Sequence, residues 1–379
     1  MIRSEFLAGA GGGVTVAQFG SPVLQTTRVA VVAPSTGPSA ALGKQLIAGV
    51  RAAVDELNLN KPPWQRGMLY TTFDDHDDAS DALVQASFAT GTGDVLAVIG
   101  HLTAAPTLAA LRTYAAASMP LVVPTVTDDR LTASGYTNVF RLPCKDSDEG
   151  ALGALYAIAA GSKAPVVLAQ SGLYGATVAA GFVRGAGVLH VNARSVQLPD
   201  TELDAAGAAN AALADAPDLV YLAGTVAKLG PVLDVLHAKG YAGRLMGSQG
   251  FFDPATATTY AKPANGIVVS TNVPYYPLAP TAQRDVNDYQ AQYGQLTPIT
   301  AYGYAAVQLV AAAIQRSGAL NRLTVMHAIA TGSNIDTITG SYSFGPFGDV
   351  LVPNCYFYAM RDGKFAYDRQ GHPGGFMLK

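Results

Sequence analysis

The chain has 379 residues, of which 49% are hydrophobic and 13% are charged. This length and composition are typical of one or two compact domains with buried cores, and they argue against a largely disordered chain or a coiled coil. The 24 basic residues nearly balance the 27 acidic ones, and neither kind forms a long run. The charge therefore gives no reason to expect nucleic acid or an anionic membrane surface as a partner.

The N-terminal segment, residues 1–26, differs from the rest of the chain. Arg3, Phe6 and Leu7 precede the small-residue stretch AGAGGGVTVA. This pattern resembles a twin-arginine export signal in which Ser4 stands in place of the second arginine. We interpret it as a signal-like segment, with a disordered tail as the alternative. No later stretch contains about twenty consecutive apolar residues, so no segment of the body is predicted to span a membrane.

From Arg28 onward, short apolar runs rich in β-branched residues alternate with longer amphipathic segments. This alternation is typical of βα units around a parallel sheet. In the first series we predict strands at 28–34, 68–75, 95–100 and 120–126, with helices at 44–58, 81–90 and 106–117 between them.

The extended stretch 136–150, which contains Pro143, interrupts this rhythm before a predicted helix at 151–160. A second series then predicts strands at 164–170, 188–198, 218–224, 244–250 and 266–271, with helices at 175–187, 202–216 and 226–240. A strongly amphipathic helix at 301–318 and a hairpin-like ending at 341–368 follow. The two series predict an α/β protein with two similar lobes.

Motifs for catalysis are missing from the expected positions. After the first strand, Gly37, Gly43 and Lys44 have the wrong spacing for either common phosphate-binding motif. No G-x-S-x-G elbow occurs, and no two of the six histidines are four residues apart. We therefore expect no catalytic residue, no cofactor and no metal.

The best metal candidate by residue type is the acidic run Asp74, Asp75, Asp77 and Asp78 together with His76. It follows a predicted strand and precedes a predicted helix, where acidic residues commonly cap the helix and favour its positive end. A solvated capping loop is the preferred interpretation.

The two cysteines, Cys144 and Cys355, lie far apart and form no C-x-x-C pair. Two buried free thiols are the preferred interpretation, and a disulfide in an oxidising compartment is the alternative.

Candidate binding residues follow the predicted strands, because ligands of open α/β sheets lie beyond the carboxyl ends of the strands. In the first series these are Thr103, Ala104 and Ala105 at a helix start, and Thr125 and Thr127 after the next strand. The free amides of a helix start suit a carboxylate. The second series offers Tyr174, Gln249 and Phe251 for the opposite side of a cleft. Four aromatic residues are expected either to stack on an aromatic ligand or to belong to the core: Phe251 again, Phe252, Tyr275 and Tyr276.

These loops belong to a longer set of fragments that resembles the leucine/isoleucine/valine-binding protein family, the type I periplasmic solute-binding proteins of ABC importers. The fragments lie between Arg28 and Tyr367 in the family's order and include VAPSTGPSAALGKQLIAGVRAAVDELN, VIGHLTAAPT, PLVVPTVTDDRLTASGYTNVFRLPCKDSDEG, SGLYG, MGSQG, AYGYAAVQLVAAAI, FGPFGDV and YAMRDGKF. The resemblance implies the type I periplasmic binding protein fold, with two doubly wound parallel-sheet lobes, a three-crossing hinge and a ligand in the cleft. It also implies that the protein is not an enzyme.

The resemblance assigns roles to individual residues. Family members bind the ligand carboxylate through the loop after VIGH and through the P-x-x-T strand end, which match Thr103, Ala104, Thr125 and Thr127. The lid tyrosine of the second lobe matches Tyr174.

Two positions depart from the family pattern. Ala104 stands where many members have serine, and Gln249 stands where many have the glutamate that pairs with the ligand ammonium. A buried ammonium without this partner would be costly, so the expected ligand is a small polar organic molecule: an amino acid or a related amide or carboxylate, aromatic ligands included. Asp253 is a candidate replacement for the glutamate.

The resemblance also predicts the domain organisation. One lobe is expected at 27–142 plus 273–351 and the other at 143–272 plus 352–379, with crossings near Leu142, Asn272 and Val352. Ligand capture is expected to close the hinge. The expected partners are the ligand and the membrane permease of an ABC importer, for a monomer in the periplasm or an equivalent exported location.

Two other functions stay open at this point. A ligand sensor of the same fold, such as an amide- or amino-acid-responsive regulator or receptor domain, would lack an export signal and need a regulatory partner. An enzyme on a doubly wound sheet is the second, although no nucleophile, metal or phosphate motif supports it.

Overall fold

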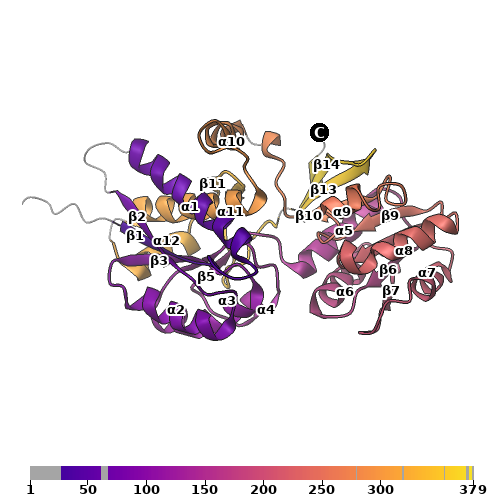
Figure 1. Ribbon diagram of the computed structural model, residues 1–379, viewed down its shortest axis with the longest axis horizontal. Coiled ribbons are helices and arrows are strands. Elements are labelled where there is room, and N and C mark those ends of the chain that lie inside the picture. Colours follow the sequence, from indigo (N-terminus) through magenta and orange to yellow (C-terminus); the bar gives the residue numbers. More distant parts are fainter. Residues whose placement is uncertain are drawn as a thin grey trace, which may run out of the picture.

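The computed structural model describes residues 27–60, 67–278, 280–317, 320–353, 355–372 and 375–377. The signal-like segment predicted at 1–26 lies outside the described residues. Figure 1 shows two lobes side by side, each with strands in its interior and helices outside. The first lobe is defined here by a five-stranded sheet and the second by an eight-stranded sheet.

The sheet of the first lobe is entirely parallel, with strand order β2-β1-β3-β4-β5. Its central strands are fully buried because helices cover both faces. The strands are β1 (Thr27–Val32), β2 (Met68–Phe73), β3 (Val95–Gly100), β4 (Leu121–Val123) and β5 (Val139–Arg141).

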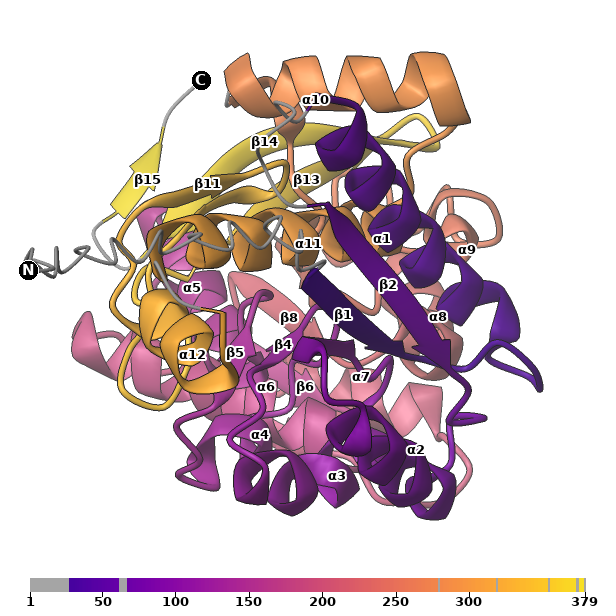
Figure 2. The ribbon, with the colours of Figure 1, turned by 90° about the vertical axis from the view of Figure 1, so that its left-hand side faces the viewer.

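Alternate residues of β1 enter two different cores, as the twofold period of a strand requires. Val29 and Val31 pack against helices on one face, and Ala30 and Val32 pack against helices on the other. Figure 2 shows α1 and α11 on one side of this sheet and α2 and α3 on the opposite side. The helices of this lobe are α1 (Ala40–Asn60), α2 (Ala79–Gly91), α3 (Ala104–Ala116), α4 (Arg130–Ala133), α10 (Pro280–Tyr293), α11 (Pro298–Ser317) and α12 (Arg322–Ala330). The short η1 (Tyr276–Leu278) precedes α10, and β11 (Ile335–Thr337) pairs with β12 (Gly340–Tyr342).

The sheet of the second lobe has the order β15-β14-β13-β10-β9-β8-β6-β7. Strands β6 to β10 run parallel, and the C-terminal strands add to β10 in antiparallel fashion. The strands are β6 (Pro165–Ala169), β7 (Arg194–Gln197), β8 (Leu219–Ala223), β9 (Arg244–Gly247), β10 (Val268–Thr271), β13 (Cys355–Arg361), β14 (Lys364–His372) and β15 (Gly375–Met377). The helices are α5 (Asp146–Ala159), α6 (Leu173–Val188), α7 (Ala205–Leu213), α8 (Val226–Ala238) and α9 (Pro254–Ala257).

Helices α5 and α6 pack closely because glycine lies at their contact. A Cβ atom on Gly150 would lie 2.0 Å from the carbonyl oxygen of Val178. We expect Gly150→Ala to lower the free energy of unfolding by about 1–3 kcal/mol, the usual cost of overpacking. Gly187 is the control, since it is also helical but nothing lies within 4 Å of an added Cβ. Gly187→Ala should be neutral or stabilising by up to about 1 kcal/mol, and urea unfolding compares the two. Equal unfolding free energies for the two variants would refute this packing argument.

One departure from the predicted elements concerns α5. The sequence predicted an extended stretch through residue 150, whereas the helix begins at Asp146. Its first turn carries Asp146, Asp148 and Glu149, which favour the positive end of the helix dipole, and the carboxylate of Asp129 accepts the Ser147 backbone N–H at 3.0 Å. The predicted strand at 188–198 is also too long, because α6 extends to Val188 and β7 covers only Arg194–Gln197.

The chain crosses between the lobes after β5, after β10 and after β12. The first two crossings are joined by hydrogen bonds, since the Cys144 backbone N–H donates to Asn272 Oδ1 at 2.8 Å. Tyr302 of α11 donates to the Asn272 carbonyl at 2.8 Å. Cys144 and Cys355 are free and buried, which confirms the preferred interpretation of two thiols, and burial raises the pKa of both well above its ordinary value.

No single helix within the described residues is long and apolar enough to cross a membrane; one bent pair, formed by parts of α10 and α11, meets the test of length and composition only.

Candidate functional site

The carboxyl ends of the two sheets line a cleft between the lobes, where two adjoining cavities share Leu102, Thr103, Thr125 and Thr127. We name them the apolar pocket, with a volume of about 250 Å³, and the acidic pocket, of about 380 Å³. The apolar pocket is also lined by Ser39, Leu42, Pro124, Pro143, Gln249, Asn272, Val273, Pro298, Ile299 and Tyr302. The acidic pocket is also lined by Ala104, Val126, Asp128, Arg130, Asp146, Leu173 and Tyr174.

This position follows from the strand order of the first lobe. Strands β2 and β3 lie on opposite sides of β1, so the connections leave β1 and β3 toward opposite faces. Such a switch point opens a crevice at the carboxyl edge of the sheet. Ser39 follows β1, Thr103 follows β3 and Thr125 follows β4, and all three line the apolar pocket.

The hydroxyl protons of Thr103 and Thr125 are already used within the first lobe. Thr103 donates to the carboxylate of Asp77, and Thr125 donates to the Leu102 carbonyl at 2.6 Å. A hydroxyl has one proton and two lone pairs, so toward a ligand these two side chains offer acceptors. The donors at this wall are the first backbone amides of α3, which have no partner within a helix, beginning at Ala104.

The acidic run after β2 holds the loops around the cleft together. Asp74 accepts hydrogen bonds from Ser35 and Thr36. Asp77 accepts from Ser39 at 2.6 Å as well as from Thr103. Asp78 caps α2, as the capping interpretation predicts, and within the described residues no group of three potential ligands could hold a metal ion.

A buried polar chain supports the loop that presents Thr103. Asp75 and His101 are fully buried, with 2.5 Å between Oδ2 and Nδ1, and His101 Nε2 lies 2.9 Å from the Tyr114 hydroxyl. Because each polar group in this chain has a partner, it fixes the loop between β3 and α3 in one arrangement.

Asp146 is a site residue that the sequence analysis missed. Its side chain is buried and lines the acidic pocket, and its Oδ1 atom has no hydrogen-bond partner among the residues that the structure describes. Burial raises its pKa to about 6, a hydrogen bond from Thr127 opposes this effect, and the nearby charges of Asp129 and Asp128 add to it. A buried carboxylate oxygen without a donor is costly, so this atom is suited to a donor brought by a ligand.

Arg130, the basic side chain that lines the same pocket, has a different partner. It forms an ion pair with Asp128, with 2.6 Å between Nη2 and Oδ2. Arg130 thus balances the charge of Asp128 and not that of Asp146. The acidic pocket therefore favours a cationic group.

Gln249 presents a donor to the apolar pocket. Its Oε1 atom accepts from the backbone N–H of Asn272 at 3.1 Å and from Asn272 Nδ2 at 2.7 Å. The Nε2 group has no hydrogen-bond partner among the described residues and belongs to a residue that lines the pocket. Gln249 therefore suits an acceptor on the ligand better than an ammonium group.

Six of the seven predicted binding residues line one of the two pockets: Thr103, Ala104, Thr125, Thr127, Tyr174 and Gln249. Phe251 does not, and its expected place in the cleft is corrected. It is fully buried in the core of the second lobe, because a turn in which its N–H bonds to the Ser248 carbonyl folds it back against Gly247.

The other proposed aromatic contacts also lie elsewhere. Phe252 packs on Tyr358 and Phe365, and Tyr275 stacks on Tyr367 with 3.9 Å between ring centroids. Tyr276 packs against the core of the first lobe. Asp253 caps α9 through the Ala255 N–H, so it does not replace the missing glutamate in the cleft.

Comparison with known proteins places this architecture. The sequence profile of the periplasmic binding protein family matches residues 26–364. The Leu/Ile/Val-binding protein homolog 3 of Brucella melitensis is 26% identical over 91% of this chain and 94% of its own length. The Leu/Ile/Val-binding protein of Escherichia coli is 24% identical over 89% of this chain and 92% of its own length.

Solved structures agree in fold. The leucine-binding protein LivK of Thermotoga maritima has a TM-score of 0.74 at 23% identity and covers 92% of this chain and 99% of its own. An ABC-transporter solute-binding protein from R. palustris, in complex with benzoate, has a TM-score of 0.69 at 21% identity and covers 93% of this chain and 98% of its own. The predicted type I periplasmic binding protein fold and the resemblance to Leu/Ile/Val-binding proteins are confirmed. The chain belongs to the periplasmic binding protein family, whose members are solute-binding proteins.

Proposed function

We propose that this protein captures an α-amino acid with an apolar side chain in the interlobe cleft and delivers it to the permease of an ABC importer. The observation that carries the proposal is the buried Oδ1 atom of Asp146, which has no hydrogen-bond partner among the described residues. From the sequence, an amino-acid ligand was doubtful because Gln249 replaces the glutamate that pairs with the ligand ammonium group. Asp146 supplies a carboxylate for that group.

The two pockets supply three complementary contacts. The ligand carboxylate docks on the first amides of α3, beside Thr103 and Ala104. The ammonium group binds Asp146, with lone pairs of Thr103 and Thr125 nearby. The side chain enters the apolar pocket, whose walls include Leu42, Leu102, Pro124, Pro143, Val273, Pro298 and Ile299.

A thermal-shift panel tests this proposal with L-leucine, L-isoleucine, L-valine, L-phenylalanine, L-leucinamide, 4-methylpentanoate and benzoate. At about 100 times its Kd, a ligand stabilises the native state by about 2.7 kcal/mol, which corresponds to a shift of roughly 3 °C for a chain of this length. We expect a shift with at least one of the amino acids and none with leucinamide or 4-methylpentanoate, each of which lacks one charged group. A shift confined to the carboxylates without an ammonium group would overturn the proposal.

The affinity for an amino acid should fall at low pH. The pKa of Asp146 is about 6 in the free protein, and a bound ammonium group stabilises the ionised carboxylate. The free protein takes up a proton as the pH falls through this value, and the ligand must displace it. We expect the Kd for an amino-acid ligand to rise about tenfold between pH 7 and pH 5, measured by calorimetry. The same measurement on Asp146→Asn should show no such rise.

We also propose the domain boundaries and the location. One lobe comprises 27–142 plus 273–351, and the other comprises 143–272 plus 352–379. The sheet to which each strand belongs supports this division. Closure at the three crossings would bring Tyr174 and Gln249 over the ligand.

Export to the periplasm is supported by the family and by the signal-like segment 1–26. Mass spectrometry of the protein from its native host should find a mature N-terminus near residue 26; a full-length chain confined to the cytoplasm would argue against transport.

A further inference from the structure

Behind the cleft, the second lobe holds a carboxyl group that the proposed ligand contacts do not use. Glu149 is 1% exposed. Its Oε1 atom accepts from the Gln249 backbone N–H at 2.6 Å and from the Ser270 hydroxyl at 2.7 Å, and its Oε2 atom accepts from the Tyr174 hydroxyl at 3.3 Å. Glu149 therefore contacts two of the polar residues that the second lobe contributes to the pockets, Tyr174 and Gln249.

The titratable groups that face Glu149 provide no positive charge. Glu149 interacts with five such groups: Tyr174 of α6, Tyr221 of β8, Cys355 of β13, Cys144 just before α5, and Asp146 of α5 itself. None of the ion pairs between described residues includes Glu149. Burial raises its pKa to about 8, against the weaker effect of its hydrogen bonds, so the carboxyl group is largely neutral at pH 7.

The protonation state of Glu149 determines what Tyr174 offers to the cleft. If Glu149 is ionised, it can only accept, and the single proton of the Tyr174 hydroxyl is used on it. If Glu149 is neutral, its own proton can satisfy Oε2 by donation to the Tyr174 oxygen. The Tyr174 proton is then free for another acceptor, and Tyr174 lines the acidic pocket. The Tyr174 oxygen also makes hydrogen bonds with the Ser248 side chain and the Gly250 backbone N–H.

We propose that Glu149 is a positioning residue whose proton sets Tyr174 as a hydrogen-bond donor to the ligand, so that loss of this proton ties the Tyr174 proton to Glu149 and withdraws that donor. The same carboxyl group holds the Gln249 loop in both states through Oε1. The ligand-facing part of this proposal rests on the proposed function, whereas the proton exchange between Glu149 and Tyr174 takes place without a ligand.

The stability of the free protein tests the protonation of Glu149. Its folded pKa of about 8 lies above the ordinary value of 4.5, so between these pH values the folded chain holds a proton that the unfolded chain has released. The free energy of unfolding contributed by this group is retained below pH 4.5 and lost as the pH rises toward 8. We expect Glu149→Gln, which imitates the neutral acid, to gain stability relative to the wild type from pH 5 to pH 8 in urea unfolding. Glu202→Gln, at an exposed glutamate, is the matched control and should follow the wild type throughout.

A spectroscopic measurement tests the exchange with Tyr174. In protein labelled with ¹³Cζ-tyrosine, the signal lost in Tyr174→Phe identifies this residue. We expect it to shift with a midpoint near pH 8 in the wild type and to stay constant in Glu149→Gln. Ionisation of Tyr174 itself does not interfere below pH 9.5, because burial raises its pKa well above its ordinary value. A purely structural role for Glu149 would not produce this shift.

A Tyr174 signal that stays constant from pH 6 to pH 9.5, or that moves equally in Glu149→Gln, overturns the proposal. So does a wild-type stability profile parallel to that of Glu149→Gln. For L-leucine, the wild-type Kd should change between pH 7 and pH 9 and the Glu149→Gln Kd should not; a constant wild-type Kd also overturns the ligand-facing part. If none of the four amino acids binds while the two ligand-free measurements succeed, the proposed function fails and the exchange between Glu149 and Tyr174 stands.

Discussion

Asp146→Asn should weaken the binding of L-leucine by about 30-fold or more, because removing one member of a buried charge pair commonly costs about 2–5 kcal/mol. Asp146 is 4% exposed, and no donor from the described part of the chain reaches its Oδ1 atom. An ammonium group would supply that donor in a site with little access to water, where such hydrogen bonds are strong. Asparagine keeps the shape of the side chain and removes the charge. Calorimetric titration of both proteins at pH 7.5 measures the effect.

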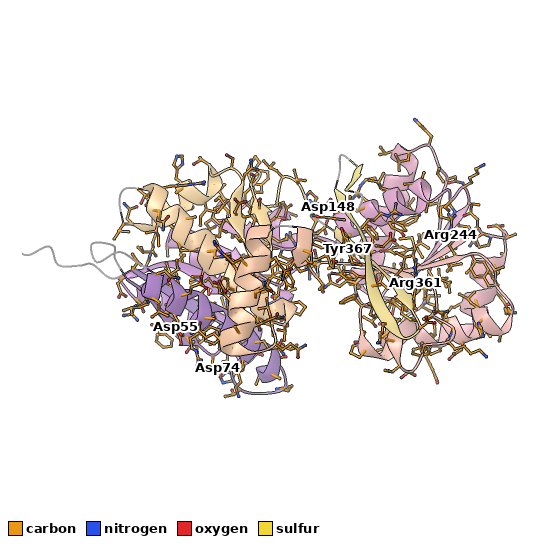
Figure 3. All side chains as sticks on the ribbon, turned by 90° about the horizontal axis from the view of Figure 1, so that it is seen from above. Asp55, Asp74, Asp148, Arg244, Arg361 and Tyr367 are labelled. Carbon is orange, nitrogen blue, oxygen red and sulfur yellow. The ribbon has the colours of Figure 1, made fainter. Side chains whose placement is uncertain are left out.

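The matched control is Asp148→Asn on the same turn of α5. Asp148 is half-buried and lines neither pocket, and its Oδ2 atom lies 4.0 Å from Lys145 Nζ. Figure 3 shows it near the junction of the two lobes, whereas Arg244 and Arg361 lie farther out on the second lobe. We expect this variant to bind L-leucine within about twofold of the wild type, as for a partly exposed ion pair. If Asp146→Asn also bound within about threefold, the ammonium contact would have to be made elsewhere.

The sequence predicted the fold well because its signals are local and repeated. The run VLAVIG is continuous and apolar, and it forms β3 over Val95–Gly100, the same residues as predicted. The alternation of such runs with amphipathic segments indicates parallel strands covered on both faces. The start of β7 was predicted too early, at VLHVN, because Val188, Leu189 and Val191 resemble a strand, although Val188 completes α6 and is exposed and β7 begins only at Arg194.

The site was predicted less completely, and the reason lies in tertiary contacts. Thr103 and Thr125 were found because they follow strands, but nothing local shows that their protons are used by Asp77 and Leu102. The stretch DSDEG was interpreted as the end of an extended stretch that contains Pro143, so Asp146 and Glu149 were not placed on a helix. Acidic residues at a helix start were the available signal.

The aromatic residues show a different limit of sequence reasoning. Phe251 follows Gln249 by two residues, and an extended chain would direct both side chains to the same side. The chain turns there instead, since the Phe251 N–H bonds to the Ser248 carbonyl and the Phe252 N–H bonds to the Gln249 carbonyl. The turn leaves Gln249 at the cleft and buries Phe251 completely. Residue spacing therefore identified the loop and not the direction of its side chains.

Asp349→Ala should destabilise the protein by about 3–5 kcal/mol, because it leaves a buried guanidinium group without its carboxylate. Arg141 of β5 is 1% exposed, and its Nε atom lies 2.9 Å from Asp349 Oδ1. The same carboxylate accepts from the Thr132 hydroxyl at 2.9 Å and lies 3.0 Å from Lys145 Nζ, immediately before α5. Asp349 thus joins the connection after β12 to the end of β5 and the start of the second lobe. Urea unfolding at pH 7.5 measures the loss, and Asp288→Ala, at an exposed position of α10, should change the unfolding free energy by less than about 0.5 kcal/mol.

A second variant separates the unpaired charge from the lost contacts. If the cost arises from leaving Arg141 charged and buried, removing that charge should relieve it, since replacing both members of a buried ion pair by apolar groups is often nearly neutral. We therefore expect Arg141→Met combined with Asp349→Ala to be more stable than Asp349→Ala alone, although Arg141 also donates to Thr132 and to the Asp128 carbonyl. A double variant that is equally or less stable would show that these hydrogen bonds dominate. The hinge would then be held by the geometry around Arg141, and the carboxylate of Asp349 would contribute mainly by orienting it.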